Sequence, residues 1–373
     1  MFDIRFDNDY ILEYNACTVS RVPATLTDGT PTEFFTITPM STPLYIRING
    51  GKPYVCTRPG ERPTTDALTA LLRVKSTSDL ECYFIRYGYF FDIAEAVTIE
   101  ARSLMRIVNR IRATVRLISS LYDNSVTNDE CIRLNAYMIL DDTRELPSVG
   151  YVPCNANLCD WIYHRATDIP VMERQSIVVD DAISQGNDLD YEEYLYIATH
   201  GTWGTAQPRV GLLDRQFFAL TKLYTARLLC PDEQLMVDYA FRLQHDYDII
   251  SSCVAGVSFY THNGINIRTP HILSSLDAVT RTVIVNEINP NLANVHFRYS
   301  PEMEPYGCYN DLLAALILCV YTTKPRNTIY RQCANHTCGV FFEVASSNGK
   351  KRYCSDACRK ASDRRRQRAR SRD

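Results

Sequence analysis

Four cysteines near the end of the chain have a spacing that could hold a metal ion. They form two close pairs, Cys333 with Cys338 and Cys354 with Cys358, in the segment CANHTCGVFFEVASSNGKKRYCSDAC. Structural zinc sites take four thiolate or imidazole ligands in a tetrahedron, and two close pairs on turns supply such a set. The spacing therefore predicts a structural Zn²⁺ site with these four cysteines as ligands.

The elements around the cysteines must bring the two pairs together. Residues 340–344 predict a short strand, Asn348-Gly349 a hairpin turn, and residues 350–353 a returning strand. Ser355 can cap a helix that begins just after Cys354, which places Cys358 in the first helical turn. This arrangement is the treble-clef plan, and with so few apolar side chains its folding would depend mainly on the metal.

The predicted helix continues into an arginine-rich tail that makes the charge of the chain uneven. The 373 residues carry a net charge of -3. Residues 331–373 hold twelve Lys or Arg and four acids, a net +8, which leaves 28 basic and 39 acidic side chains and a net -11 in residues 1–330. A basic end on an acidic body indicates a partner of negative charge held at that end.

Nucleic acid is the partner that this tail favours, because the arginine guanidinium suits phosphate oxygens. The candidate contacts are Lys350, Lys351, Arg352, Arg359, Lys360, Arg364, Arg365, Arg366, Arg368 and Arg370. We expect DNA more than RNA, although phosphate contacts alone do not distinguish the two. A solubilising or localisation-type basic terminus is the alternative.

The cysteine segment resembles the zinc finger of bacterial CGNR-type proteins, a family regarded as stress-induced transcription regulators that carry an N-terminal ABATE domain. The resemblance covers about the last forty residues and implies the same four zinc ligands. A weaker similarity lies in Ile132-Arg133-Leu134-Asn135, which follows a long arginine-bearing helix as in that family. Cys358 is followed by Arg359-Lys360-Ala361, where the family has Gly-Asn-Arg.

Upstream of the finger, the pattern predicts an α+β protein with a mixed, mainly helical body. Residues 1–64 contain β-branched and aromatic stretches between turns and predict a small N-terminal sheet. Residues 65–328 form the mainly helical body, and residues 329–373 the zinc finger with its tail. Helical patterns include residues 231–250 and the apolar run at residues 311–321, while Asn263-Gly264 predicts a hairpin.

The longest helical pattern, residues 97–122, joins one apolar stripe to a row of arginines. Arg102, Arg106, Arg110, Arg112 and Arg116 lie in it, with Glu100 as its only acid. Such a row could follow a phosphate backbone, but runs of charge more often mark a solvated face paired with acids elsewhere.

No familiar catalytic motif is present, so we do not expect an enzyme. Cys154 and Cys159 repeat the spacing of the first pair with His164 nearby, and buried thiols explain them better than a second metal. His200 and His245 have no visible partners for acid–base chemistry.

The sequence therefore favours a cytoplasmic, nucleic-acid-binding regulator, acting on transcription by the resemblance, whose body responds to a small-molecule or protein effector. The start of the chain does not resemble a signal peptide, and the longest apolar run is half the length that crosses a membrane. Two alternatives remain: a nucleic-acid-targeted effector enzyme that uses the finger for targeting, and a zinc-stabilised protein-interaction scaffold. The oligomeric state is left open.

Overall fold

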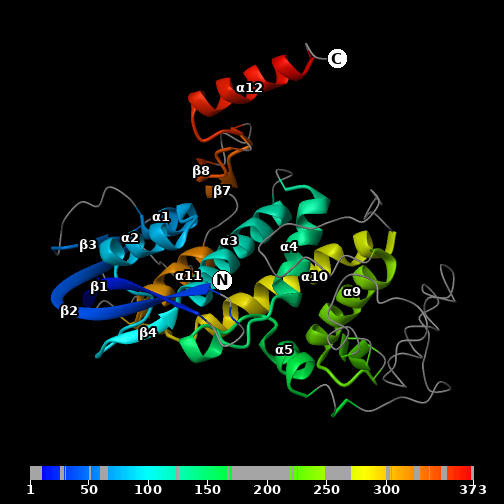
Figure 1. The fold of residues 1–373 in the computed structure, drawn as a ribbon, viewed down its shortest axis with the longest axis horizontal. Coiled ribbons are helices and arrows are strands. Elements are labelled where there is room, and N and C mark those ends of the chain that lie inside the picture. Colours follow the sequence, from blue (N-terminus) through cyan, green and yellow to red (C-terminus); the bar gives the residue numbers. More distant parts are fainter. Residues whose placement is uncertain are drawn as a thin grey trace. The chain divides into compact units, whose positions relative to one another are not determined.

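Helix and sheet are mixed along the chain, as the sequence predicts (Figure 1). This computed structural model describes residues 11–25, 29, 31–49, 52–58, 66–122, 126–165, 168–169, 219–220, 222–224, 226–247, 270–299, 303, 305–322, 328–335, 337–345 and 351–370. The strands are β1 (Ile11–Thr25), β2 (Pro31–Asn49), β3 (Lys52–Cys56), β4 (Val97–Glu100), β5 (Val295–Tyr299), β6 (Pro305–Tyr309), β7 (Thr328–Gln332) and β8 (Phe341–Ala345). The helices are α1 (Ala67–Arg73), α2 (Thr77–Tyr87), α3 (Ala101–Tyr122), α4 (Asn128–Leu140), α5 (Ala156–Tyr163), α9 (Pro231–Tyr247), α10 (Pro270–Asn291), α11 (Leu312–Thr322) and α12 (Asp356–Arg370), with a 3-10 turn at Pro147–Val149.

The chain divides into two compact units. Unit 1 comprises Met1–Ser125 and Ile288–Asp373, and unit 2 comprises Val126–Glu287. Unit 1 is therefore built from two separate stretches of sequence, and unit 2 from the stretch between them. The division into residues 1–64, 65–328 and 329–373 rests on changes in sequence pattern and stays a prediction.

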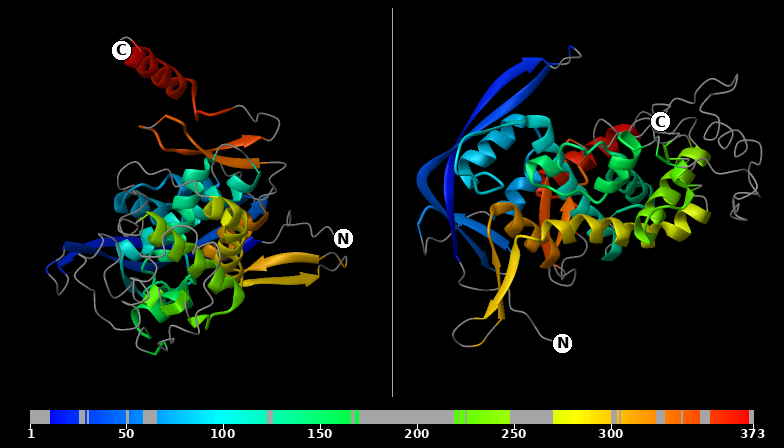
Figure 2. Two further views of the ribbon diagram at one scale, coloured as in Figure 1. Left: turned by 90° about the vertical axis from the view of Figure 1, so that its right-hand side faces the viewer. Right: turned by 90° about the horizontal axis from the view of Figure 1, so that it is seen from below.

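An antiparallel sheet in unit 1 is organised around β2. β1 pairs along most of β2, with an irregularity between Asn15 and Cys17, whereas β3 and β4 pair with different parts of β2. β1 and β2 form the long blue ribbon of Figure 2. The small N-terminal sheet expected from the sequence is present, and β4 joins it from beyond residue 64.

One face of the sheet packs on α2. Phe35 of β2 is fully buried and meets Phe84 of α2 edge to face, with ring centroids 6.5 Å apart. Tyr14 of β1 donates its hydroxyl hydrogen bond to the carbonyl of Tyr87, at the end of α2. Ser76 caps the start of α2 in a reciprocal capping box with Asp79. Aromatic burial and a firm helix start thus fix α2 against the sheet.

The long arginine-bearing helix begins at Ala101, four residues later than the sequence pattern predicts. Residues 97–100 instead form β4, in which Val97 pairs with Ile37 and Glu100 with Phe34. β-branched residues beside an available strand gain more from pairing than from another helical turn. The helix prediction was therefore wrong at its first turn and correct for Ala101–Tyr122.

The arginines of α3 do not form one solvated face. Arg110 is fully buried, Arg116 is 6% exposed, and Arg112 donates from Nε to the carbonyl of Leu72 at 3.2 Å. Desolvation lowers the pKa of Arg112 to about 10. Arg102 remains exposed. The row is therefore neither a continuous phosphate-binding surface nor one solvated face, because Arg110 and Arg116 lie in the interior.

The apolar run near the end of the body forms the buried helix that the sequence predicts. Leu312 to Val320 of α11 are all buried, and Asp311 caps the helix by accepting from the amide of Ala314 at 2.7 Å. The amide of Leu313 donates to the carbonyl of Phe90 at 2.9 Å. α11 packs against β2 and β3, so it completes the core under the N-terminal sheet.

Unit 2 is helical in its described part and contains buried polar clusters. Pro231 starts α9, as expected, and α9 packs with α4. Glu287 is 1% exposed and accepts from the hydroxyl of Tyr151 at 2.6 Å and the amide of Cys154 at 2.7 Å. These bonds satisfy a carboxylate that burial would otherwise disfavour.

Some sequence predictions lie outside the described residues. These are the hairpin at Asn263-Gly264, His200, and the side chain of His245. Within the described helices, none combines the length and apolar character needed to cross a membrane.

Candidate metal centre

The first cysteine pair lies in the connection between β7 and β8. The two strands pair antiparallel from Thr328 with Ala345 to Gln332 with Phe341. Directly after β7, the amide of Cys333 donates to the carbonyl of Val340 at 2.9 Å. The amide of Cys338 donates to the carbonyl of Asn335 at 2.8 Å, and Gly339 follows with a φ of +57°. This tight turn presents two thiols from one short loop, and glycine accommodates its left-handed backbone.

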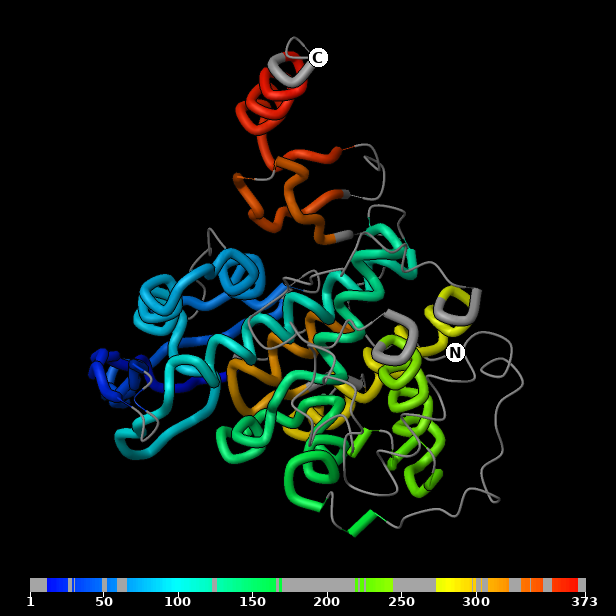
Figure 3. Tube along the Cα trace, turned by 45° about the vertical axis from the view of Figure 1, so that its right-hand side comes forward, coloured from blue at the N-terminus to red at the C-terminus, as the bar shows by residue number. Residues whose placement is uncertain are grey.

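The second pair reaches the first through backbone contacts beside β7. The carbonyl of Arg352 accepts from the amide of Ala334 at 2.9 Å, and the carbonyl of Lys351 accepts from Nη1 of Arg331 at 3.0 Å. Ser355 then caps α12, since its Oγ accepts from the amide of Cys358 at 3.3 Å. The predicted cap and the position of Cys358 in the first helical turn are confirmed. Figure 3 follows this path from β7 through β8 into α12.

The predicted hairpin within the finger was wrong in its pairing. Lys351 and Arg352 are not in a strand, and β8 pairs with β7, which precedes the first cysteine. Asn348-Gly349 and Lys350 lie outside the described residues. The residues Thr328, Ile329 and Tyr330 favour a strand through β-branching and an aromatic ring, and this signal could have identified β7.

The four thiols converge on one point. All four Sγ atoms lie within 4.8 Å of one another, with 3.6 Å between Cys338 and Cys354 and 3.5 Å between Cys354 and Cys358. A tetrahedral ion with sulfur at about 2.3 Å would separate its ligands by roughly 3.8 Å. The amide of Cys354 also donates to Sγ of Cys333 at 3.5 Å, a contact that stabilises a thiolate. The donor set and its spacing therefore fit a thiolate-bound metal ion.

The pKa shifts of the thiols are consistent with metal binding. Hydrogen bonds from the side chains of Asn335 and Ser355, with a contribution from Cys354, lower the pKa of Cys358 to about 6. Burial, then the neighbouring thiols, raises the pKa of Cys354 to about 12, and burial also raises that of Cys338. Crowded thiols lose their first proton readily and resist losing more, so a cation among them would stabilise the full set of thiolates.

A very small apolar core supports the metal centre. Phe342 and Val344 of β8 are buried beside Cys333, and Tyr353 packs against them with the other three cysteines. A cluster of this size cannot hold a fold by apolar burial alone. A metal ion bound by the four cysteines would supply most of the remaining stability of this part of the chain.

Helix α12 is docked on the finger by polar side chains. Ser362 is 9% exposed, and its hydroxyl shares a hydrogen bond of 3.2 Å with the hydroxyl of Tyr353. Arg365 donates from Nη1 to Oδ1 of Asn335 at 3.0 Å and from Nη2 to Oγ1 of Thr337 at 2.9 Å. The helix is therefore held by polar contacts to the first cysteine loop, which its composition did not reveal.

The remaining candidate contacts for nucleic acid lie mostly on the surface. The exposed cations in this group are Lys351, Arg352, Arg359, Lys360, Arg364 and Arg366. Arg365 is exposed as well, although it makes the two hydrogen bonds described above. The side chains of Arg368 and Arg370 lie outside the described residues, as does Lys350. Lys351, Arg352 and Arg359 line a cleft of about 450 Å³ at the start of α12, where Arg359 also pairs with Asp356 at 3.2 Å. The arrangement presents positive charge around the helix start as well as along the helix.

Described side chains from the N-terminal part of unit 1 contact the finger. Lys52 pairs with Glu343 of β8, and Nζ of Lys75 donates to the carbonyl of Cys338. Ser119 of α3 donates to the carbonyl of Tyr330 at 3.1 Å. Sequence reasoning did not find these residues, because nothing in the local pattern of a lone lysine or serine indicates a contact more than two hundred residues away.

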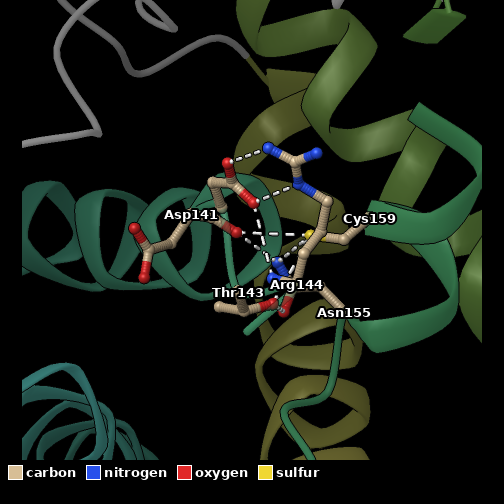
Figure 4. Close-up of polar contacts among 6 residues, drawn as sticks. Asp141, Thr143, Arg144, Asn155 and Cys159 are labelled. Atoms are coloured by element: carbon tan, nitrogen blue, oxygen red, sulfur yellow. Dashed lines mark hydrogen bonds and ion pairs between the residues drawn. The ribbon is translucent and has the colours of Figure 1, made fainter. Parts of the chain in front are cut away.

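The second cysteine cluster serves the fold of unit 2. Cys154 donates to the carbonyl of Met138 and Cys159 to that of Asp141, each at 3.4 Å, and both thiols are buried. Figure 4 shows Cys159 within a network of Asn155 and Thr143. His164 is exposed. Over the part of the chain that the structure describes, only the four C-terminal cysteines form a group able to hold a metal ion.

No protein-family model, curated protein or solved structure is significantly similar to this chain. The geometry of the metal centre and its surroundings is therefore the basis for inferring its function.

Proposed function

We propose that this chain is a nucleic-acid-binding regulator whose C-terminal module is a treble-clef zinc finger. The observation that carries the proposal is a basic helix, α12, held against a four-cysteine centre. Zinc suits four thiolates because it has no geometric preference that opposes a tetrahedron and stays redox-inert. A loop between two strands supplies the first ligand pair, and the residues around the start of a helix supply the second, which supports a treble-clef-like plan.

The proposed ligand is the phosphate backbone of nucleic acid, with DNA favoured. Exposed Lys360 and Arg364 on α12, together with Lys351 and Arg352 beside the cleft, offer positive charge on a solvent-accessible surface. The dipole of α12 also favours negative charge near the start of the helix. Contacts of this kind give affinity and register and carry little base information. The local resemblance to CGNR-type fingers supports a role in transcription.

The metal part of the proposal is tested by metal content. Elemental analysis of the intact protein is expected to give one zinc per chain, and Cys354→Ser to lose it. Cys82→Ser is the matched control because Cys82 is exposed and lies on α2. Equal zinc content in Cys354→Ser and in the control would argue against the four-cysteine site.

The nucleic-acid part is tested by binding of the intact, zinc-loaded protein to labelled duplex DNA over a salt series. The logarithm of the affinity should fall linearly with the logarithm of salt concentration, by a slope of about 0.9 per phosphate neutralised. Lys360→Glu combined with Arg364→Glu should weaken binding and reduce the slope. Arg281→Glu is the control, because Arg281 is an exposed residue of α10 whose pair with Asp277 has little energetic weight.

Either of two results would contradict nucleic-acid binding: an affinity independent of salt, or a charge-reversed helix that binds as tightly as the original. Parallel series with duplex RNA and with an acidic polypeptide separate the preferred ligand from the alternatives, since the same cations could contact any polyanion.

A further inference from the structure

Three anchoring residues fix the rotation of α12 about its own axis. Cys358, Ser362 and Arg365 follow one another at spacings of four and three, so they lie on one face of the helix. Cys358 belongs to the thiol cluster, Ser362 bonds to Tyr353, and Arg365 bonds to Asn335 and Thr337. Each anchor contacts the finger, and together they allow one orientation of the helix.

Arg365 differs from the other arginines of the helix in what it contacts. Its two terminal nitrogens donate to the amide oxygen of Asn335 and the hydroxyl of Thr337, at 3.0 and 2.9 Å. Thr337 also donates to the same oxygen of Asn335 at 3.2 Å. These acceptors lie between Cys333 and Cys338, so the guanidinium closes the loop that presents the first pair of thiols.

Asn335 connects this bond to the metal centre on its other side. It is 5% exposed, and its backbone carbonyl accepts from the amide of Cys338 at 2.8 Å, while its side-chain oxygen accepts from Arg365. One residue therefore contacts the backbone of a candidate ligand and the arginine that holds the helix. Outer contacts of this kind orient ligands and change metal affinity.

The fixed rotation decides which cations face away from the finger. At about 100° per residue, Lys360 and Arg364 lie on the side of the helix opposite to Ser362. Both are exposed. A helix free to roll would present its cations in all directions, whereas the anchored helix presents this pair, one turn apart, to a ligand.

We infer that Arg365 is a positioning residue that couples metal loading to the orientation of the basic helix, and that it is not itself a phosphate contact. The inference rests on the proposed function for its nucleic-acid half. Because coupling between two binding events is reciprocal, nucleic acid should tighten metal binding by the same factor as metal tightens nucleic-acid binding. Arg365 carries that coupling through Asn335 and Thr337.

The first experiment measures metal affinity of the full chain without nucleic acid. Co²⁺ serves as the probe, followed by its thiolate charge-transfer absorption in competition with a chelator. Arg365→Ala should bind Co²⁺ about 10-fold more weakly, as expected for loss of an outer-shell partner. Arg365→Lys should recover part of the loss, because one ammonium can reach one of the two acceptors. Arg364→Ala, the neighbouring exposed arginine, should match the original protein.

A double-mutant cycle ties the effect to the observed bond. Thr337→Ala should weaken Co²⁺ binding less than Arg365→Ala, and the double variant should lose less than the product of the two single effects, because both remove the same contact. Multiplicative losses would show that Arg365 acts elsewhere and would overturn the assignment.

The second experiment measures the salt dependence of duplex DNA binding at saturating zinc. Arg365→Ala should lower affinity with the slope unchanged, whereas Arg364→Ala should reduce the slope by about 0.9. A reduced slope in Arg365→Ala with unaltered Co²⁺ affinity would identify Arg365 as a phosphate contact and overturn the inference. If no variant and no parent protein binds nucleic acid, the proposed function fails, while the Co²⁺ measurements still decide the coupling of helix and metal centre.

Discussion

At the scale of single residues, Gly88 allows α2 to end against the sheet. Its φ of +80° lies in the region that side chains rarely adopt, and a Cβ at this position would overlap the ring of Tyr14. Tyr14 cannot move aside without losing its hydrogen bond to the carbonyl of Tyr87. Glycine is therefore required here for two independent reasons, backbone conformation and space.

Gly88→Ala is expected to destabilise the protein by about 2–4 kcal/mol, the sum of a left-handed alanine and a steric overlap in the core. Gly29→Ala is the matched control, because Gly29 has a similar φ of +84° and a Cβ added there would meet nothing within 4 Å. The control should lose only about 1 kcal/mol. Chemical denaturation of both variants measures the difference, and equal losses would contradict the steric part of the argument.

Asn155 stabilises the fold of unit 2 through the hydrogen bonds of its side chain. It is fully buried, and its Nδ2 donates to the carbonyls of Ile139 and Asp141, both at 2.9 Å, while its Oδ1 accepts from Thr143 at 3.0 Å (Figure 4). These bonds hold the chain together where it leaves α4. One side chain thus hydrogen-bonds two carbonyls and a hydroxyl.

Asn155→Ala should therefore cost about 2–4 kcal/mol of stability, since it removes the hydrogen bonds of a fully buried side chain. Asn157→Ala, two residues away, removes an exposed hydrogen bond to Glu233 of 2.7 Å and should change stability by less than about 0.5 kcal/mol. Thermal unfolding of the two variants compares them directly. A similar midpoint for both would mean that the network in Figure 4 is not important for stability.

At the scale of elements, we expect the finger to depend on a bound metal ion more than any other described part of the chain. Its apolar cluster consists of Phe342, Val344 and Tyr353 with the cysteines. We expect a zinc chelator to remove hydrogen-exchange protection from β8 and the first turn of α12, because metal binding supplies their folding free energy. Protection in α2 and α11 should persist. Retained protection in β8 after complete metal removal, verified by elemental analysis, would contradict this prediction.

The sequence was sufficient where local chemistry decides the structure. α11 follows from its apolar run, α9 from Pro231, and the start of α12 from Ser355, since caps and burial act within a few residues. The four candidate ligands likewise follow from spacing, and the structure brings all four together.

The sequence was insufficient where distant segments compete for the same residues. β4 replaces the first turn of a predicted helix because β2 is available as a partner, and β8 pairs with β7 in place of the later segment. The burial of Arg110 and the role of Arg365 depend on neighbours that are far away or on the other side of a loop. Neither residue differs in type from the other arginines of its helix.

At the scale of the whole molecule, the two units should differ in their response to metal. The cysteines, α12 and the contacts described around them all belong to unit 1. Hydrogen exchange at several temperatures should therefore show a lower unfolding midpoint for unit 1 after chelation and an unchanged midpoint for α4 and α9 of unit 2. An equal decrease in both would indicate that the chain unfolds as one cooperative system.

The two stretches of sequence that form unit 1 leave the ribosome at different times. The apolar face of β2 is covered in part by α11, which lies more than 260 residues later in the chain. While the ribosome makes the intervening residues, the N-terminal sheet has no access to that helix and leaves apolar surface open to other chains. Segments in this state are prone to aggregate. Translation of this protein would therefore create a nascent intermediate that needs chaperone protection until α11 leaves the exit tunnel.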